Sequence, residues 1–164
     1  MSLRAAFIKV DEIHTLVVRR LVFVLLFVMF ATTLVATIMR YVPAFPGLIW
    51  GEEVTRYASI WMVFLASAIG IRRGVHLGVD VFAMLLPAQI RRFVTLAGLL
   101  LIFIFEWVLV YFGAIMTVSN MDQMSSALEM PMGLPFLAVP VGGLLMAYET
   151  GRELWTCFRS ETRR

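Results

Sequence analysis

The sequence predicts an all-α integral membrane protein with four transmembrane helices and both termini in the cytoplasm. Three observations lead to this prediction: the composition, four long apolar runs, and the positions of the basic residues between them. Of the 164 residues, 61% are hydrophobic and only 15% are charged, whereas a soluble domain carries about 45–50% apolar and about 25% charged residues. This composition excludes a disordered chain, a collagen and a disulfide-stapled fold, and Cys157 is the single cysteine.

Each of the four apolar runs is long enough, or nearly so, to cross a bilayer. A hydrocarbon core of about 30 Å requires about 20 helical residues. The first three runs, residues 21–38, 54–71 and 93–118, contain at most one charged residue each, and the fourth is 131–151. The first run is longer than a signal-peptide core, and no small-residue cleavage site follows it. We therefore expect a retained helix and one membrane domain over residues 1–164.

The basic residues predict the orientation of these spans. Of the 14 Lys and Arg residues, four lie in the N-terminal tail, four between the second and third spans, and four in the C-terminal tail. A four-span chain places these three segments on one side of the membrane, and cytoplasmic segments are enriched in Lys and Arg. Both termini are therefore predicted to be cytoplasmic, and only Arg40 and Arg56 lie toward the outer side.

Two further stretches and one proline add detail to this arrangement. Apolar residues recur at three- and four-residue steps in 3–18 and in 77–86, a pattern typical of amphipathic helices on a membrane surface. The alternative is that both stretches are solvated extensions of the neighbouring spans. Pro140 lacks an amide hydrogen, so a kink is expected in the last span.

Two charged residues lie inside the predicted spans, where a charge is costly. Glu106 follows Arg92 by 14 residues, which places it about 21 Å from the cytoplasmic boundary and about 9 Å from the outer one. Arg56 follows Trp50 by six residues, again about 9 Å from the outer boundary. We therefore hypothesise an ion pair between Arg56 and Glu106 inside the helix bundle. The functional alternative for Glu106 is a proton-coupling carboxylate.

No combination of residues indicates catalysis or a bound cofactor. The two histidines, His14 and His76, lie outside the spans, so a bis-histidine haem inside the bundle is excluded. No cluster of His, Cys and acidic residues suits a zinc ion, and no glycine-rich phosphate loop with a following lysine is present. We predict a protein that is not an enzyme and that has no cofactor, no metal and no nucleic-acid partner.

Charged and aromatic residues at the membrane boundaries are candidate contact sites. Glu52 and Glu53 begin the second span, where carboxylates suit the positive end of a helix. Together with Trp50 they also form a candidate docking surface for an external partner. On the cytoplasmic side, two arginine pairs lie at the depth of phospholipid headgroups and are candidate lipid contacts. These pairs are Arg72 with Arg73 and Arg91 with Arg92.

Three motifs occur in order along the chain. The first is the run Trp50–Tyr57 (WGEEVTRY), and the second is a cytoplasmic turn formed by Arg73, Gly74, His76 and Asp80. The third comprises Ser126–Leu128, Pro131–Met132 and Ala138–Gly142. Together, on a four-span chain, these motifs resemble the small membrane subunit (Q subunit, DctQ-like) of tripartite ATP-independent periplasmic (TRAP) transporters. The resemblance covers roughly residues 21–155.

This resemblance implies a role and a set of partners. Members of the family pair a small four-helix subunit with a large membrane subunit, here a separate chain, and with a soluble periplasmic substrate-binding protein. They import organic acids such as C4-dicarboxylates or sialic acid, and an ion gradient, typically of sodium, drives the uptake. The large subunit moves as an elevator, whereas the small subunit is a fixed scaffold that helps to dock the binding protein. The implied location is the bacterial cell inner membrane.

Two other functions fit the residues taken alone. One is a self-contained proton-coupled exporter, assembled as a small oligomer, in which Glu106 is the coupling group. The other is a membrane anchor or assembly factor without a transport role. The spans contain very few polar residues with which to bind a transported anion, and this favours a scaffold over a carrier.

Overall fold

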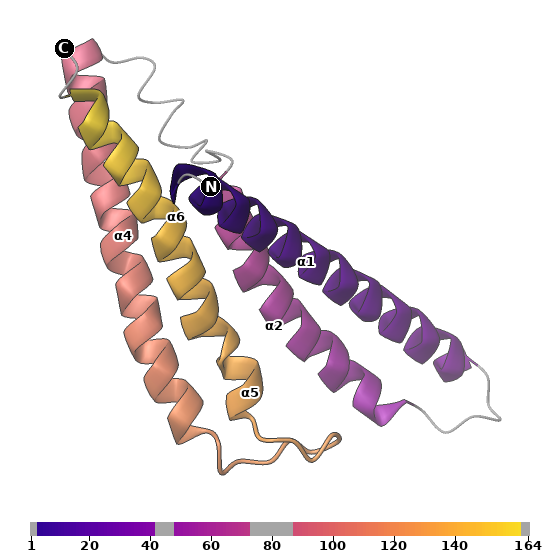
Figure 1. Cartoon of the computed structure of the whole chain (residues 1–164). Coiled ribbons are helices and arrows are strands. Elements are labelled where there is room, and N and C mark those ends of the chain that lie inside the picture. Colours follow the sequence, from indigo (N-terminus) through magenta and orange to yellow (C-terminus); the bar gives the residue numbers. More distant parts are fainter. Residues whose placement is uncertain (1–2, 42–47, 73–86, 162–164) are drawn as a thin grey trace.

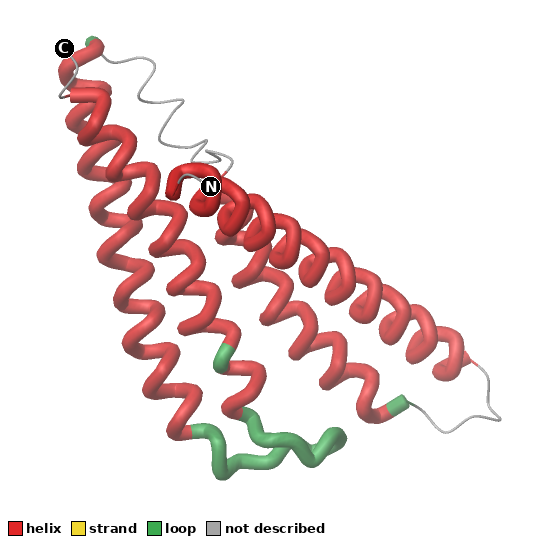
Figure 2. Tube along the Cα trace, in the orientation of Figure 1, coloured by secondary structure: helices red, strands yellow, loops and turns green. Residues whose placement is uncertain are grey.

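The computed structural model describes residues 3–41, 48–72 and 87–161. Within these ranges the chain forms four long helices and one short helix (Figure 1). Figure 2 shows that the remaining described residues are loops. Among these residues, one isolated antiparallel bridge joins Met124 to Pro131. The predicted all-α fold is therefore confirmed.

The long helices account for all four predicted spans. Each contains a stretch that is long and apolar enough to cross a membrane, and these stretches overlap the runs expected from the sequence. The helices are α1 (Leu3–Tyr41), α2 (Ile49–Arg72), α4 (Ala88–Ser119) and α6 (Ala138–Glu161), with the short α5 (Gly133–Phe136) directly before α6. The apolar stretches are Asp11–Tyr41, Ile49–Arg72, Phe93–Ser119 and Gly133–Cys157.

The long helices lie side by side in a single row, in the order α1, α2, α6, α4 (Figure 1). In this row α2 packs on α1 and α6, and α6 packs on α2 and α4, but the backbones of α2 and α4 are not adjacent. The result is a layer one helix thick rather than a closed bundle. Because α1 begins and α6 ends at the same end of the row, we call it the termini end. The opposite end, which carries the loop 120–132, is the loop end.

The interior of the row is centred on α6. In the apolar window of the fourth span 56% of the residues are buried, whereas none are buried in that of α1. Two glycines allow close approach of the neighbouring helices. A Cβ added at Gly142 would lie 2.5 Å from Cβ of Phe64 on α2, and one at Gly113 on α4 would lie 2.8 Å from Val139 on α6. Small residues at such contacts let membrane helices pack backbone to backbone, so α6 joins α2 to α4.

The sequence also predicts three finer features. Residues 3–18 are continuous with the first span in α1, their location on the membrane surface stays a prediction, and 77–86 lie outside the described residues. The last span is interrupted at Leu137, between α5 and α6, three residues before the kink expected at Pro140. The reason is that Pro140 has no N–H to donate to the carbonyl of Phe136, four residues earlier.

Candidate functional site

At the termini end, four charged side chains from α1, α2 and α6 form what we call the termini-end ion cluster: Asp11, Arg72, Glu149 and Arg152. Arg72 reaches both carboxylates, with Nη2 2.6 Å from Asp11 Oδ2 and Nη1 3.3 Å from Glu149 Oε1. Arg152 reaches the same two, with Nη1 2.7 Å from Asp11 Oδ1 and 3.2 Å from Glu149 Oε2. Two cations and two anions are thus balanced, and they tie three helices together.

This cluster corrects the prediction for Arg72. The sequence places Arg72 among phospholipid headgroups, but its guanidinium is bound by two carboxylates and its side chain is only 25% exposed. Among the other arginines of that prediction, Arg91 is exposed, and its contact with lipid stays a prediction. Arg73 and the side chain of Arg92 lie outside what the structure describes.

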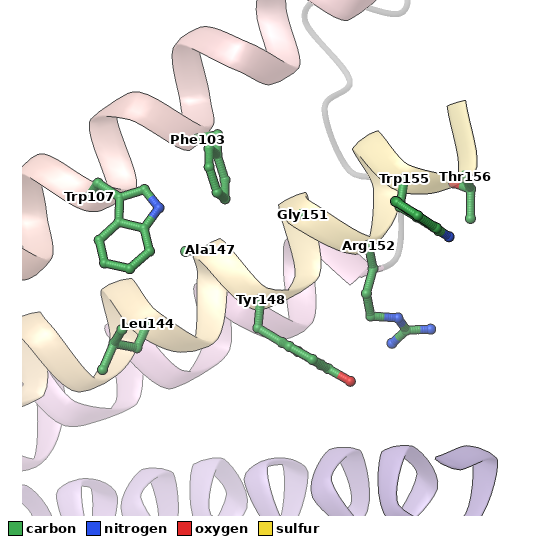
Figure 3. Close-up of a pocket in the computed structure, with 9 residues that line it drawn as sticks. All are labelled: Phe103, Trp107, Leu144, Ala147, Tyr148, Gly151, Arg152, Trp155 and Thr156. Atoms are coloured by element: carbon green, nitrogen blue, oxygen red, sulfur yellow. The ribbon is translucent and has the colours of Figure 1, made fainter. Parts of the chain in front are cut away.

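A groove of about 640 Å³ lies beside this cluster, between α4 and α6 (Figure 3). Its walls are mainly aromatic and aliphatic, and Arg152 lies at its margin with its guanidinium 5.8 Å from the ring centre of Tyr148. Because this guanidinium is already bound by two carboxylates, the groove offers a transported anion no free cation. The lining residues are Phe103, Trp107, Leu144, Ala147, Tyr148, Gly151, Arg152, Trp155 and Thr156.

Glu106, in the middle of α4, is buried against α6. It is only 2% exposed, and its Oε1 accepts a 2.7 Å hydrogen bond from the hydroxyl of Thr150, which is completely buried. Arg56 has a different neighbour, because its Nη2 lies 3.8 Å from Glu53 Oε1 and its side chain is 60% exposed. The hypothesised ion pair between Arg56 and Glu106 is therefore wrong.

The error has a geometric cause. The depth estimate assumed a bundle in which any two helices can meet, but α6 separates α2 from α4 in the row. Side chains also lean toward the N-terminus of their helix, and Glu106 accordingly reaches Thr150, toward the termini end. The residue before Thr150, Glu149, pairs with Arg72. Since Arg72 follows Arg56 by 16 residues, Arg56 lies about 24 Å from Arg72 along α2, toward the loop end.

At the loop end, Glu53 of α2 holds the loop between α4 and α5. Its carboxylate accepts three hydrogen bonds, from the Ser126 hydroxyl at 2.9 Å and from the N–H groups of Ala127 at 3.2 Å and Leu128 at 3.1 Å. Glu53 is 5% exposed, and these three donors satisfy the buried carboxylate. We call this arrangement the Glu53 clamp.

The clamped loop is a compact turn. The N–H of Ser125 donates to the carbonyl of Met130 at 2.9 Å, and the N–H of Met132 donates to the carbonyl of Gln123 at 2.8 Å. Glu129 has a φ of 50°, a left-handed conformation that residues other than glycine rarely adopt. The clamp thus holds a turn that contains a strained residue.

The clamp corrects the docking prediction for Glu53. A carboxylate buried by its own chain is not available to an external partner, whereas Trp50 and Glu52 are exposed and their docking role stays a prediction. The sequence does carry a signal for the clamp, because two of the family motifs, Trp50–Tyr57 and Ser126–Leu128, contain its acceptor and its donors. Sequence reasoning missed that these two motifs meet.

The cytoplasmic turn motif of Arg73, Gly74, His76 and Asp80 lies outside the described residues. Within the part of the chain that the structure describes, no group of three or more His, Cys, Asp and Glu side chains is placed to hold a metal ion. The fold and the two polar sites therefore define a polytopic membrane protein in which buried charged side chains tie its own helices and loop together.

Comparison with known proteins gives the family. The family model described as tripartite ATP-independent periplasmic transporters, DctQ component, matches residues 29–160. The chain belongs to this family, which confirms the resemblance seen in its motifs. The family consists of transporter components rather than enzymes, in agreement with the prediction that the chain is not an enzyme.

Three curated relatives illustrate the similarity. The chain is 35% identical over 104 residues to the C4-dicarboxylate TRAP transporter small permease protein DctQ of Rhodobacter capsulatus, a match that covers 62% of this chain and 46% of that protein. It is 25% identical over 127 residues to the sialic acid TRAP transporter permease protein SiaT of Haemophilus influenzae, covering 75% of this chain and 20% of that one. It is 27% identical over 135 residues to the isethionate TRAP transporter permease protein DctMQ of Oleidesulfovibrio alaskensis, covering 72% and 20%. The matches thus span less than half the length of these relatives.

Proposed function

We propose that this chain is the small membrane subunit of a TRAP importer of organic acids in a bacterial inner membrane. Family membership supports the role, and the names of the relatives, which refer to C4-dicarboxylates, sialic acid and isethionate, support small organic anions as substrates. The basic residues support an orientation in which the termini end faces the cytoplasm and the loop end faces the periplasm.

The observation that carries the proposal is the single row of helices. In the part of the chain that the structure describes, a layer one helix thick encloses no path for a substrate, but it presents two broad apolar faces. Aromatic side chains such as Phe23, Phe27 and Phe30 on α1 are more than 60% exposed, and Phe105 and Phe112 are similarly exposed on α4. Such faces suit a protein that lies against a larger membrane partner. That partner is the large TRAP subunit, which holds the substrate and sodium sites and moves as an elevator.

The two polar sites suit a scaffold that does not move. The termini-end ion cluster ties α1, α2 and α6 together at one end of the row. The Glu53 clamp ties α2 to the loop after α4 at the other end. Because the row is fastened at both ends, its helices are held in one arrangement while the partner moves.

The loop end supplies a surface for the periplasmic substrate-binding protein. The clamped loop exposes Asp122 and Glu129, and Trp50 and Glu52 are exposed at the start of α2. In this role Glu53 does not touch the partner but keeps the loop in its docking conformation. The acidic side chains would attract basic groups on the binding protein and would guide its approach.

The burial of Glu106 weighs against the self-contained exporter. A coupling carboxylate must meet water on each side of the membrane in turn, whereas Glu106 is 2% exposed and bonded to Thr150 between α4 and α6. These contacts support a structural role in fastening α4 to α6.

Reconstitution tests the proposal. The chain is incorporated into proteoliposomes alone, with the large membrane subunit, and with both the large subunit and the binding protein, and uptake of a labelled C4-dicarboxylate or sialic acid is followed. We expect uptake only with all three components and an inward sodium gradient. Proton-linked transport by this chain alone would favour the exporter. Failure to bind any large subunit would favour an anchor without a transport role.

A further inference from the structure

A second groove lies between α1 and α2 at the loop end, with a volume of about 760 Å³. Two guanidinium groups, from Arg40 and Arg56, and one carboxylate, from Glu52, line it together with hydroxyl-bearing and small side chains. Its charged lining therefore carries more positive than negative charge. This distinguishes it from the apolar groove between α4 and α6, where the one cation among the described lining residues, Arg152, is already paired.

Arg56 is the residue in this groove whose charge points to a bound anion. It lies seven residues into α2, about 10 Å from the start of the helix, yet its side chain is 60% exposed. Its nearest carboxylate, Glu53, is 3.8 Å away and already accepts three hydrogen bonds from the clamped loop. The ring of Tyr57 lies 5.5 Å from the guanidinium carbon and supports one side of it. A guanidinium exposed at this depth of a span is costly unless an anion reaches it.

The depth of the groove indicates which anion this is. Arg40 is the penultimate residue of α1, and Leu48 and Ile49 at the start of α2 line the same groove. The groove therefore begins at the membrane boundary. A long arginine side chain can extend several ångströms toward that boundary, so the guanidinium of Arg56 can meet a headgroup there. We propose that this groove binds the phosphate of a phospholipid from the leaflet at the loop end, between Arg40 and Arg56.

Photo-crosslinking inside the groove identifies the occupant. Thr37 lines the groove and is exposed, so a benzophenone amino acid at this position reports on what fills it. The full-length variant is irradiated in native membranes that contain its assembled complex, and the intact mass of the chain is measured. We expect an adduct of phospholipid mass. An adduct with another polypeptide, or no adduct at all, would overturn the proposal.

Charge variants test the role of the two arginines. Each neutralisation, Arg40→Gln or Arg56→Gln, should lower the yield of the lipid adduct about fivefold, since one basic side chain near a membrane surface contributes about that factor. Arg56→Lys should retain most of the yield. The matched control is Arg20→Gln, because Arg20 is exposed on α1 far from the groove, and its yield should not change. An unchanged yield in the Arg40→Gln/Arg56→Gln double variant would contradict the proposal. The measurement involves no uptake, so it is independent of the proposed transport function.

Discussion

The two ends of the helix row are fastened by different kinds of polar contact. At the termini end, four charged side chains share their contacts, and both Arg72 and Arg152 reach the same two carboxylates. At the loop end a single carboxylate, that of Glu53, binds one hydroxyl and two backbone N–H groups. The first site is therefore redundant, whereas the second depends on one residue.

The two sites also differ in the exposure of their side chains. The arginine side chains of the cluster are 25% and 40% exposed, although its carboxylates, Asp11 at 12% and Glu149 at 5%, are about as buried as that of Glu53 at 7%. Charges that meet water are screened and contribute little, but a buried polar group that loses its partner costs its full desolvation energy. The number of ionic contacts at a site therefore does not measure the importance of that site to the fold.

The largest effect is expected for Glu53→Ala. This change removes three hydrogen bonds to a charged group and leaves the N–H groups of Ala127 and Leu128 without their acceptor, so it should lower the free energy of unfolding by about 3 kcal/mol. Denaturation in detergent micelles measures this change. Amide hydrogen exchange of the two N–H groups should become faster. The control is Glu52→Ala at the exposed neighbouring position, and unchanged exchange in Glu53→Ala would argue against the clamp.

A smaller effect is expected for Arg72→Gln. Because Arg152 still contacts both Asp11 and Glu149, the loss should be only about 1 kcal/mol. The double variant Arg72→Gln/Arg152→Gln should lose more than the sum of the single changes, since it leaves two carboxylates without a cation. The same denaturation experiment measures all three variants. Strictly additive losses would show that the cluster is not redundant.

The effect of salt on stability should also differ between the two sites. Raising the salt concentration from about 0.05 M to about 1 M shortens the screening length to about 3 Å. The destabilisation caused by Arg72→Gln should shrink, because the cluster is partly exposed. The destabilisation caused by Glu53→Ala should stay the same, because the clamp is buried. Equal salt dependence at both sites would remove the distinction between them.

The smallest effect on stability is expected for Glu52→Lys. Glu52 is exposed, so the free energy of unfolding should change by less than about 0.5 kcal/mol. If the loop end docks the binding protein, uptake should nevertheless fall several-fold at limiting concentrations of that protein and recover when it is in excess. Unchanged uptake at every concentration would remove Glu52 from the docking surface.

The four spans could be predicted because they depend on local composition. The runs 21–38, 54–71 and 93–118 are apolar enough to be recognised without knowledge of their neighbours, and the structure contains a helix over each. The neighbours of Arg56 and Glu106 could not be predicted in this way, and the expected ion pair between these two residues is wrong. Their neighbours depend on the order of the helices in the row, and no property of a single span contains that order.

The Glu53 clamp shows the same limit at the level of one residue. The motif residues of α2 and of the 120–132 loop are both visible in the sequence, but they lie 73 to 75 positions apart. A carboxylate at the start of a helix is already explained by the positive end of the helix dipole. This local explanation for Glu53 gave no reason to expect its contacts with the loop.

The sequence by itself indicated the family of the chain and the four helices that are long and apolar enough to cross a membrane. The transfer of each residue from water to lipid contributes to insertion independently of the helix packing, so the apolar spans can be recognised by summing along the chain. Only the tertiary structure decided that the helices form a row, that Glu106 meets Thr150, and that Glu53 is buried. The physical reason is that these spans are apolar on every side, so their packing depends on shape complementarity, as where Gly142 lies against Phe64. The hydropathy of a span does not depend on this complementarity.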